Sequence, residues 1–138
     1  MAANKQPIFT NVPSIEWGTS ALTTANTAKD GTGTVLTVFT AEATNGSFVQ
    51  KIRFRAAGTN VATVARIFIN NGSTNTTASN NILYDEMTLS ATTLSETSSL
   101  ALYELPLNIG LPPGYKINVT IGTTVSAGYY VSVVGGDY

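Results

Sequence analysis

The sequence contains no cysteine and no histidine among its 138 residues. Without cysteine, the chain can form neither disulfides nor thiolate metal sites. Without histidine, it lacks the commonest general base and the commonest nitrogen ligand of transition metals. We therefore expect no catalytic residues, no cofactor and no metal site, and we expect that the protein is not an enzyme.

Charged residues are also scarce. They make up 11% of the chain, compared with about 25% in soluble domains. Threonine, serine, asparagine and glycine take their place, and a surface of hydroxyl and amide groups loses less hydration free energy than a charged one when a neighbour covers it. Such a composition suits a subunit of an assembly, although a β-rich domain that uses much threonine would look the same.

The small net charge of −1 excludes two classes of partner. No basic run is long enough for a nucleic acid or an anionic membrane surface. No segment approaches the roughly 18 consecutive apolar residues of a membrane-spanning helix, and the first residues lack the apolar core of a signal peptide. We therefore expect neither nucleic acid nor membrane as a partner, and synthesis in the cytoplasm.

Turn signals divide most of the chain into short segments rich in β-branched residues, and no segment has a convincing helical pattern. About eight strands at spacings of about 8–12 residues predict an all-β sandwich of antiparallel strands. The strand count favours a jelly roll, and an immunoglobulin-like sandwich is the alternative. The expected strands cover residues 34–41, 47–57, 61–70, 81–89, 100–109, 115–121 and 129–134, with a further threonine-rich strand within 18–29.

The first 18 residues show no sustained period of a strand or a helix. We expect residues 1–18 to form an extended N-terminal arm and residues 19–138 to form a single β-sandwich domain. Large apolar residues in this arm either fold back over the sandwich or anchor the chain in a neighbouring subunit. These residues are Ile8, Phe9, Ile15 and Trp17.

Alternation in residues 47–57 places three cations, Lys51, Arg53 and Arg55, together with Val49 on one side of a strand. The other side is mainly apolar and is expected to face the core. Arg66 lies on the next strand and would extend the cations into a ladder. Such a ladder either contacts an acidic protein surface, a sugar or a phosphate, or is an ordinary solvated strand face.

Tyr130 is a further candidate for contact with a partner. It follows Tyr129 directly, and neighbouring side chains on a strand point to opposite faces. If one ring packs in the core, the other faces outward, where it can form an interface or stack on a ligand.

The glycine-rich stretch at Asp30-Gly31-Thr32-Gly33 lacks the features of a phosphate or calcium loop and is interpreted as a turn.

Three stretches of the chain resemble small virion proteins of tailed bacteriophages: TAKDGTGTV at 27–35, IRFRAAGTNVATVAR at 52–66 and GYYVSVVGGDY at 128–138. The resemblance implies a capsid decoration (cement) protein with a jelly-roll-like fold, made in the host cytoplasm and located on the capsid surface of the virion. Proteins of that class clamp capsomers together, often as dimers or trimers, and reach neighbours with an N-terminal arm. The implied partners are the major capsid protein and further copies of the chain.

A tail or fibre module that binds a host carbohydrate or receptor is the alternative function. Such modules have the same composition, rich in threonine, asparagine and glycine, and jelly rolls occur in lectins as well as in capsid proteins. The two hypotheses differ in the surface that they require. Carbohydrate binding needs exposed tyrosines beside a groove, whereas capsid binding needs a broad contact area.

Overall fold

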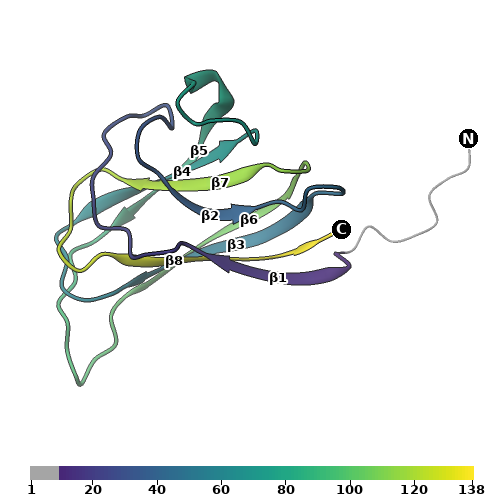
Figure 1. Cartoon of the computed structure of the whole chain (residues 1–138). Coiled ribbons are helices and arrows are strands. Elements are labelled where there is room, and N and C mark those ends of the chain that lie inside the picture. Colours follow the sequence, from purple (N-terminus) through teal and green to yellow (C-terminus); the bar gives the residue numbers. More distant parts are fainter. Residues whose placement is uncertain (1–9) are drawn as a thin grey trace, which may run out of the picture.

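The computed structural model describes residues 10–138 and arranges them as two stacked β-sheets of four strands each (Figure 1). The all-β sandwich of antiparallel strands predicted from the sequence is confirmed. The only helix in the described part of the chain is the short 3₁₀ helix η1 (Ala78–Asn80), and no helix there has the length and hydropathy to cross a membrane. The strands are β1 (Val12–Trp17), β2 (Leu36–Thr40), β3 (Ser47–Ala56), β4 (Thr63–Asn70), β5 (Asn81–Leu89), β6 (Leu102–Leu111), β7 (Lys116–Ile121) and β8 (Tyr129–Asp137).

Strands that are distant in the sequence lie side by side in both sheets. One sheet, here called sheet A, has the order β1-β8-β3-β6, and the other, sheet B, has the order β2-β7-β4-β5. Among consecutive strands, only β4 and β5 are neighbours in one sheet, and every other connection passes from one sheet to the other. Pro106 lies in β6, at the edge of sheet A. Proline has no N–H to donate to a strand ladder, so within sheets it occurs mainly on edge strands.

A β-bulge changes which residues of β3 face the core. The register of β3 with both of its neighbours shifts between Val49 and Lys51. Against β8, Gln50 is the extra residue, whereas against β6 the extra residue lies on β6, between Pro106 and Ile109. Val49 was expected to share the outer face with Lys51, but it is fully buried, as are Ile52 and Phe54. The bulge therefore turns both halves of a long, bent strand toward the same core.

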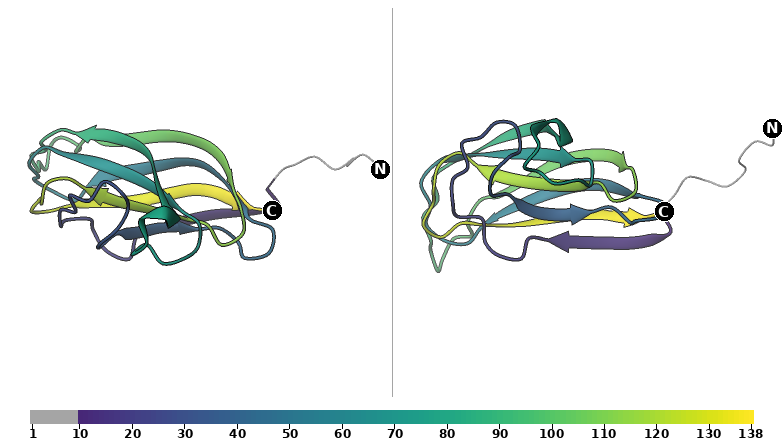
Figure 2. Two further views of the ribbon diagram at one scale, coloured as in Figure 1. Left: turned by 90° about the horizontal axis from the view of Figure 1, so that it is seen from above. Right: turned by 45° about the horizontal axis from the view of Figure 1, so that its top comes forward.

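The segment between β1 and β2 crosses the outer side of sheet B (Figures 1 and 2). Asn26 donates its backbone N–H to the carbonyl of Ile121 at the end of β7, at 2.8 Å. Further on, the side-chain amide of Asn75, in the loop after β4, donates to the carbonyls of Gly31 and Gly33 at 3.1 and 2.7 Å. These bonds hold residues 26–34 across sheet B.

Phe68 shows the effect of this cover. Its neighbour Ile67 belongs to the core between the sheets, so Phe68 faces the outer side of sheet B, because successive side chains of a strand alternate. Phe68 is nevertheless fully buried. An apolar side chain is therefore covered on the outer side of sheet B. Within the described residues, no segment crosses the outer side of sheet A in this way.

The N-terminal region differs from the expected arm. Residues 12–17, which fall within the expected arm of residues 1–18, form β1 and pair with β8 from Val12 opposite Asp137 to Trp17 opposite Ser132. The stretch 18–29, where a strand was expected, contains only isolated bridges to the ends of β8 and β7. Residues 12–17 join the sheet because the outer edge of β8 has backbone N–H and C=O groups that need hydrogen-bond partners, and β1 provides those partners.

Candidate interaction face on sheet A

The outer face of sheet A carries the basic residues of β3 in direct contact with β8. In the antiparallel register, Arg55 lies opposite Tyr130 and Arg53 lies opposite Ser132. Tyr129 is fully buried and Tyr130 is 61% exposed. The prediction that one of these two tyrosine rings faces outward is confirmed, and the exposed ring lies beside a guanidinium group.

The same face carries two large apolar residues of β1. Trp17 lies opposite Ser132 and Ile15 lies opposite Val134, so both share the outward side of β8 with Tyr130. Trp17 is 68% exposed and Ile15 is 62% exposed. Trp17 and Tyr130 are diagonal neighbours across the strand pair, a separation that aromatic side chains can bridge. Part of the expected arm therefore contributes to the sheet itself, with its apolar side chains pointing to solvent.

The cations of this face outnumber the anions. Glu104 on β6 lies opposite Arg53, and its Oε1 atom lies 2.9 Å from Arg53 Nε and 3.3 Å from Lys51 Nζ. Arg55 forms no ion pair within residues 10–138. Lys51, Arg53, Arg55 and Glu104 together give this face a net charge of +2, although the whole chain has a net charge of −1.

Arg66 is not part of this face. The sequence pattern placed it on a strand next to the other cations, but its strand, β4, belongs to sheet B. There, the Arg66 Nε atom pairs with Glu86 Oε1 at 3.1 Å, and the Arg66 side chain is only 12% exposed. The expected ladder of four basic residues is therefore limited to three, because the chain changes sheet between β3 and β4.

Two residues of the face were not identified from the sequence. Leu102 lies opposite Arg55 and is 41% exposed, and Glu104 pairs with two cations as described above. Only the exposed positions of an alternating pattern in 102–106 could have indicated them. Ile8 and Phe9 lie outside the described residues.

Glu16 points to the opposite side of β1, toward the space between the sheets. Its register partner is Val133, a fully buried residue of β8. Partial burial raises the pKa of the Glu16 carboxyl, the backbone N–H of Thr40 counteracts this by bonding to it, and the nearby carboxylate of Asp137 adds to the rise in pKa. An acidic group thus lies under the edge of the sandwich and close to the exposed face.

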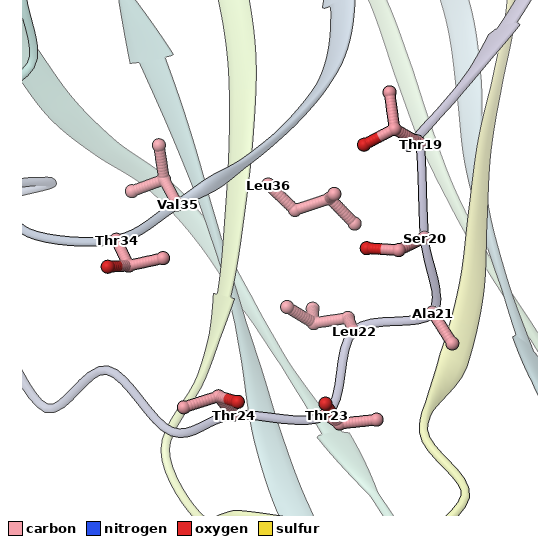
Figure 3. Close-up of a pocket in the computed structure, with 9 residues that line it drawn as sticks. All are labelled: Thr19, Ser20, Ala21, Leu22, Thr23, Thr24, Thr34, Val35 and Leu36. Carbon is pink, nitrogen blue, oxygen red and sulfur yellow. The ribbon is translucent and has the colours of Figure 1, made fainter.

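A cavity of about 260 Å³ lies between the segment that follows β1 and the start of β2 (Figure 3). The side chains of Leu22 and Leu36 point into it, and threonine and serine hydroxyls lie along its rim. No ionisable side chain lines it. Its walls can therefore make apolar contacts and neutral hydrogen bonds, but they offer no charge to a ligand.

The remaining sequence candidates have local structural roles. Asp30 accepts hydrogen bonds from the hydroxyl and the backbone N–H of Thr32 at 2.6 and 3.1 Å, which lower the pKa of its carboxyl and close the turn that was predicted there. Within residues 10–138, no group of three or more Asp and Glu side chains lies close enough to hold a metal ion.

Comparisons with known proteins give no significant match: no protein-family model, no curated protein and no solved structure is similar to the chain. Residue roles therefore cannot be transferred from a relative. What the described residues offer is an exposed face on sheet A that combines apolar side chains with an excess of positive charge.

Proposed function

We propose that this protein is a structural virion protein of the capsid decoration (cement) type, which binds the major capsid protein on the outer surface of a tailed-phage head. The observation that carries the proposal is the outer face of sheet A, where Ile15, Trp17 and Tyr130 are each more than 60% exposed beside the cations of β3. Exposed aromatic and apolar side chains that share one face are typical of protein interfaces, and isolated ones are not.

The physical role of this face is adhesion over an area. Tryptophan, tyrosine and arginine are the residues that most often dominate the binding free energy of an interface. The net charge of +2 favours an acidic partner surface and would accelerate encounter with it. In a shell with many identical sites, repeated weak contacts between such faces and capsomers would together stabilise the shell.

The strand order supports a jelly roll as the type of sandwich. In a constant-type immunoglobulin domain, the first two strands are hydrogen-bonded neighbours in one sheet. Here β1 and β2 belong to different sheets, and β1 pairs with the last strand, β8. An eight-stranded double sheet whose connections mostly cross between the sheets is the arrangement of a jelly roll, a fold used by viral capsid proteins and by lectins.

The test is binding to phage heads that lack this protein. We expect the purified chain to bind them in a saturable manner, and we expect the double variant Trp17→Ala, Tyr130→Ala to bind at least tenfold more weakly. Ile82→Ala is the matched control, because Ile82 is 63% exposed but lies on β5 of the other sheet. Equal binding of the double variant and the control, or the location of the chain in the tail of an imaged particle, would contradict the proposal.

The alternative is a tail or fibre module that binds a host carbohydrate. The observation that favours it is the diagonal pair of exposed rings, Trp17 and Tyr130, with Ser132 between them. Aromatic faces stack on sugar rings, and the neighbouring Arg53 could donate hydrogen bonds to hydroxyl groups. Binding to a glycan array that is lost in Tyr130→Ala, together with failure to bind heads, would favour this function over the first.

A further inference from the structure

The outer edge of β1 is a row of backbone groups without partners in the described structure. β1 is the last strand of sheet A, and no strand within residues 10–138 pairs with its outer edge. The backbone N–H of Gly18 donates to the carbonyl of Val131 in β8 at 3.1 Å. Because backbone groups alternate along a strand, those of Ser14 and Glu16 also point to β8. The N–H and C=O groups of Ile15 and Trp17 consequently point away from the sheet.

Pro13 limits how this edge can be used. Pro13, Ile15 and Trp17 are alternate residues of β1, so their backbone groups point the same way, to the free edge and not to β8. The N–H that proline lacks is therefore one that would have pointed to the free edge. The β1–β8 ladder loses no bond from it. An incoming strand, however, finds no donor at residue 13. The donors of the free edge within β1 are therefore those of Ile15 and Trp17.

We propose that β1 pairs in an antiparallel manner with β1 of a second copy of the chain, about a twofold axis at Glu16. In this register, Ile15 of each copy lies opposite Trp17 of the other. Each of these two pairs exchanges two N–H···O bonds, so that every available donor meets an acceptor and Pro13 is not required. A twofold axis at Ile15 would instead place Pro13 opposite Trp17 and lose two of six bonds.

The side chains and charges of β1 also favour a second copy. Ile15 and Trp17 point to the same face, so the pairing places each exposed Ile15 against an exposed Trp17 of the other copy. No charged side chain of β1 lies on that face. The cations of β3 lie two strands inward, so those of the two copies would be five strand spacings apart, about 24 Å. This distance exceeds the Debye length of about 8 Å at physiological salt, so their repulsion is screened.

The dimer would present two copies of the outer face of sheet A on one continuous sheet of eight strands. The sequence predicted self-association as a dimer or trimer. This proposal specifies a twofold dimer that forms through the outer edge of β1. It does not depend on the proposed function, because it concerns the purified chain alone. A dimer that forms as described while head binding fails would remove the capsid proposal and leave this inference intact.

Cysteine scanning tests the register directly, since the chain has no cysteine of its own. In Glu16→Cys, the two new side chains meet at the twofold axis, with Cα atoms about 4.5 Å apart, a separation within the range of disulfides. Ser14→Cys is the matched control on the same face of β1, where the two Cα atoms would be about 14 Å apart. We expect mild oxidation to give a covalent dimer of Glu16→Cys and little of Ser14→Cys. Equal yields, or a higher yield from Ser14→Cys, would overturn the register.

Sedimentation equilibrium of the full chain tests the edge. We expect a concentration-dependent dimer whose dissociation constant rises at least tenfold in Ile15→Pro, because this substitution removes a donor of the free edge without removing a bond to β8. Ile82→Ala, on the opposite side of the sandwich, should leave the constant unchanged. A wild-type chain that stays monomeric at its highest soluble concentration would overturn the proposal, as would an unchanged constant in Ile15→Pro.

A second readout is the effect of charge at the axis. Glu16 and its copy would lie directly opposite each other, where like charges repel. Of the elements packed against Glu16, β8 contributes one further carboxylate, Asp137, and β2 contributes the N–H of Thr40 and no charged side chain. We therefore expect Glu16→Gln to dimerise several-fold more tightly than wild type at neutral pH, with the difference vanishing in acid. Weaker dimerisation of Glu16→Gln would contradict the placement of Glu16 at the axis.

Discussion

The side-chain amide of Asn60 binds Gly128 through both of its polar atoms. The N–H of Gly128 donates to Asn60 Oδ1 at 2.7 Å, and Asn60 Nδ2 donates to the Gly128 carbonyl at 3.0 Å. The N–H of Ala127 donates to the same Oδ1 atom at 2.9 Å. Asn60 lies in the turn between β3 and β4 and is 3% exposed, and Gly128 immediately precedes β8. This one side chain therefore connects the turn to the strand that carries Tyr130.

Asn60→Ala should lower the free energy of unfolding by about 2–3 kcal/mol, because it leaves the N–H groups of Ala127 and Gly128 without an acceptor. Urea denaturation followed by tryptophan fluorescence measures the change. Asn45→Ala is the control, since Asn45 is exposed and its side chain makes no hydrogen bond within the described residues; its effect should stay within about 0.5 kcal/mol. Similar losses in the two variants would show that the buried amide has no special role.

The raised pKa of Glu16 predicts a specific pH dependence of stability. The folded state holds the Glu16 proton more tightly than the unfolded state, whose pKa is near the ordinary value of 4.5. The resulting stabilisation is present below that value and is lost as pH rises through the higher folded pKa. Glu16→Gln removes this dependence, so the variant should gain stability relative to wild type as pH rises from about 4 to 7.

Chemical denaturation of both proteins across this pH range gives the comparison. Using the difference between variant and wild type cancels the contributions of Asp30 and Glu42, whose pKa values are lowered and whose effects run in the opposite direction. Self-association has to be kept constant by working at one low protein concentration. A difference that is flat with pH, or that falls as pH rises, would contradict the raised pKa.

The strands were largely predictable because local pattern determines them. The segments expected at 47–57, 81–89 and 115–121 agree with β3, β5 and β7 to within one residue at each end. Their β-branched residues and the turn signals between them act over a few residues, which a sequence shows directly. The edge position of Pro106 also has a local reason, because the missing N–H is a property of that one residue.

The pairing of strands was not predictable in the same way. Arg66 follows β3 closely in the sequence but lies in the other sheet, while Glu104, about 50 residues from Arg53, is its partner. Trp17 was assigned to an arm because β1 has no hydrophobic period of its own. The partner of β1 is β8, at the far end of the chain, and only the closed sandwich brings the two together. The candidate face thus depends on long-range pairing.

Truncation separates the part of the expected arm that belongs to the sandwich from the residues before it. Removal of residues 1–17 takes away β1 and leaves the outer edge of β8 unpaired. Compared with a chain that lacks only residues 1–9, this chain should be less stable by about 3 kcal/mol or more, because several strand hydrogen bonds are lost together. Urea denaturation of the two truncated chains checks the difference. Equal stabilities would mean that the pairing of β1 with β8 contributes nothing to the free energy of unfolding.

The segment that crosses sheet B should be held in place by Asn75. Its side-chain amide donates to the carbonyls of Gly31 and Gly33, while no other side chain of the β4–β5 loop donates to residues 26–34 in the described structure. Asn75→Ala should therefore release this segment without unfolding the sandwich. The expected loss of global stability is about 1–2 kcal/mol, and hydrogen exchange should become faster within residues 26–34 while exchange in β3 changes little.

Asn71→Ala provides the comparison in the same loop, because within residues 10–138 the Asn71 side chain bonds only to Asn80 and Ser73, which lie in that loop. Its exchange rates within 26–34 should match those of wild type. Phe68 reports the same event, since it is fully buried on the side of sheet B that the segment crosses. If the segment is released, Phe68 should become mobile on the timescale of side-chain relaxation measured by NMR. Unchanged exchange and unchanged Phe68 dynamics in Asn75→Ala would show that other contacts suffice to hold the cover over sheet B.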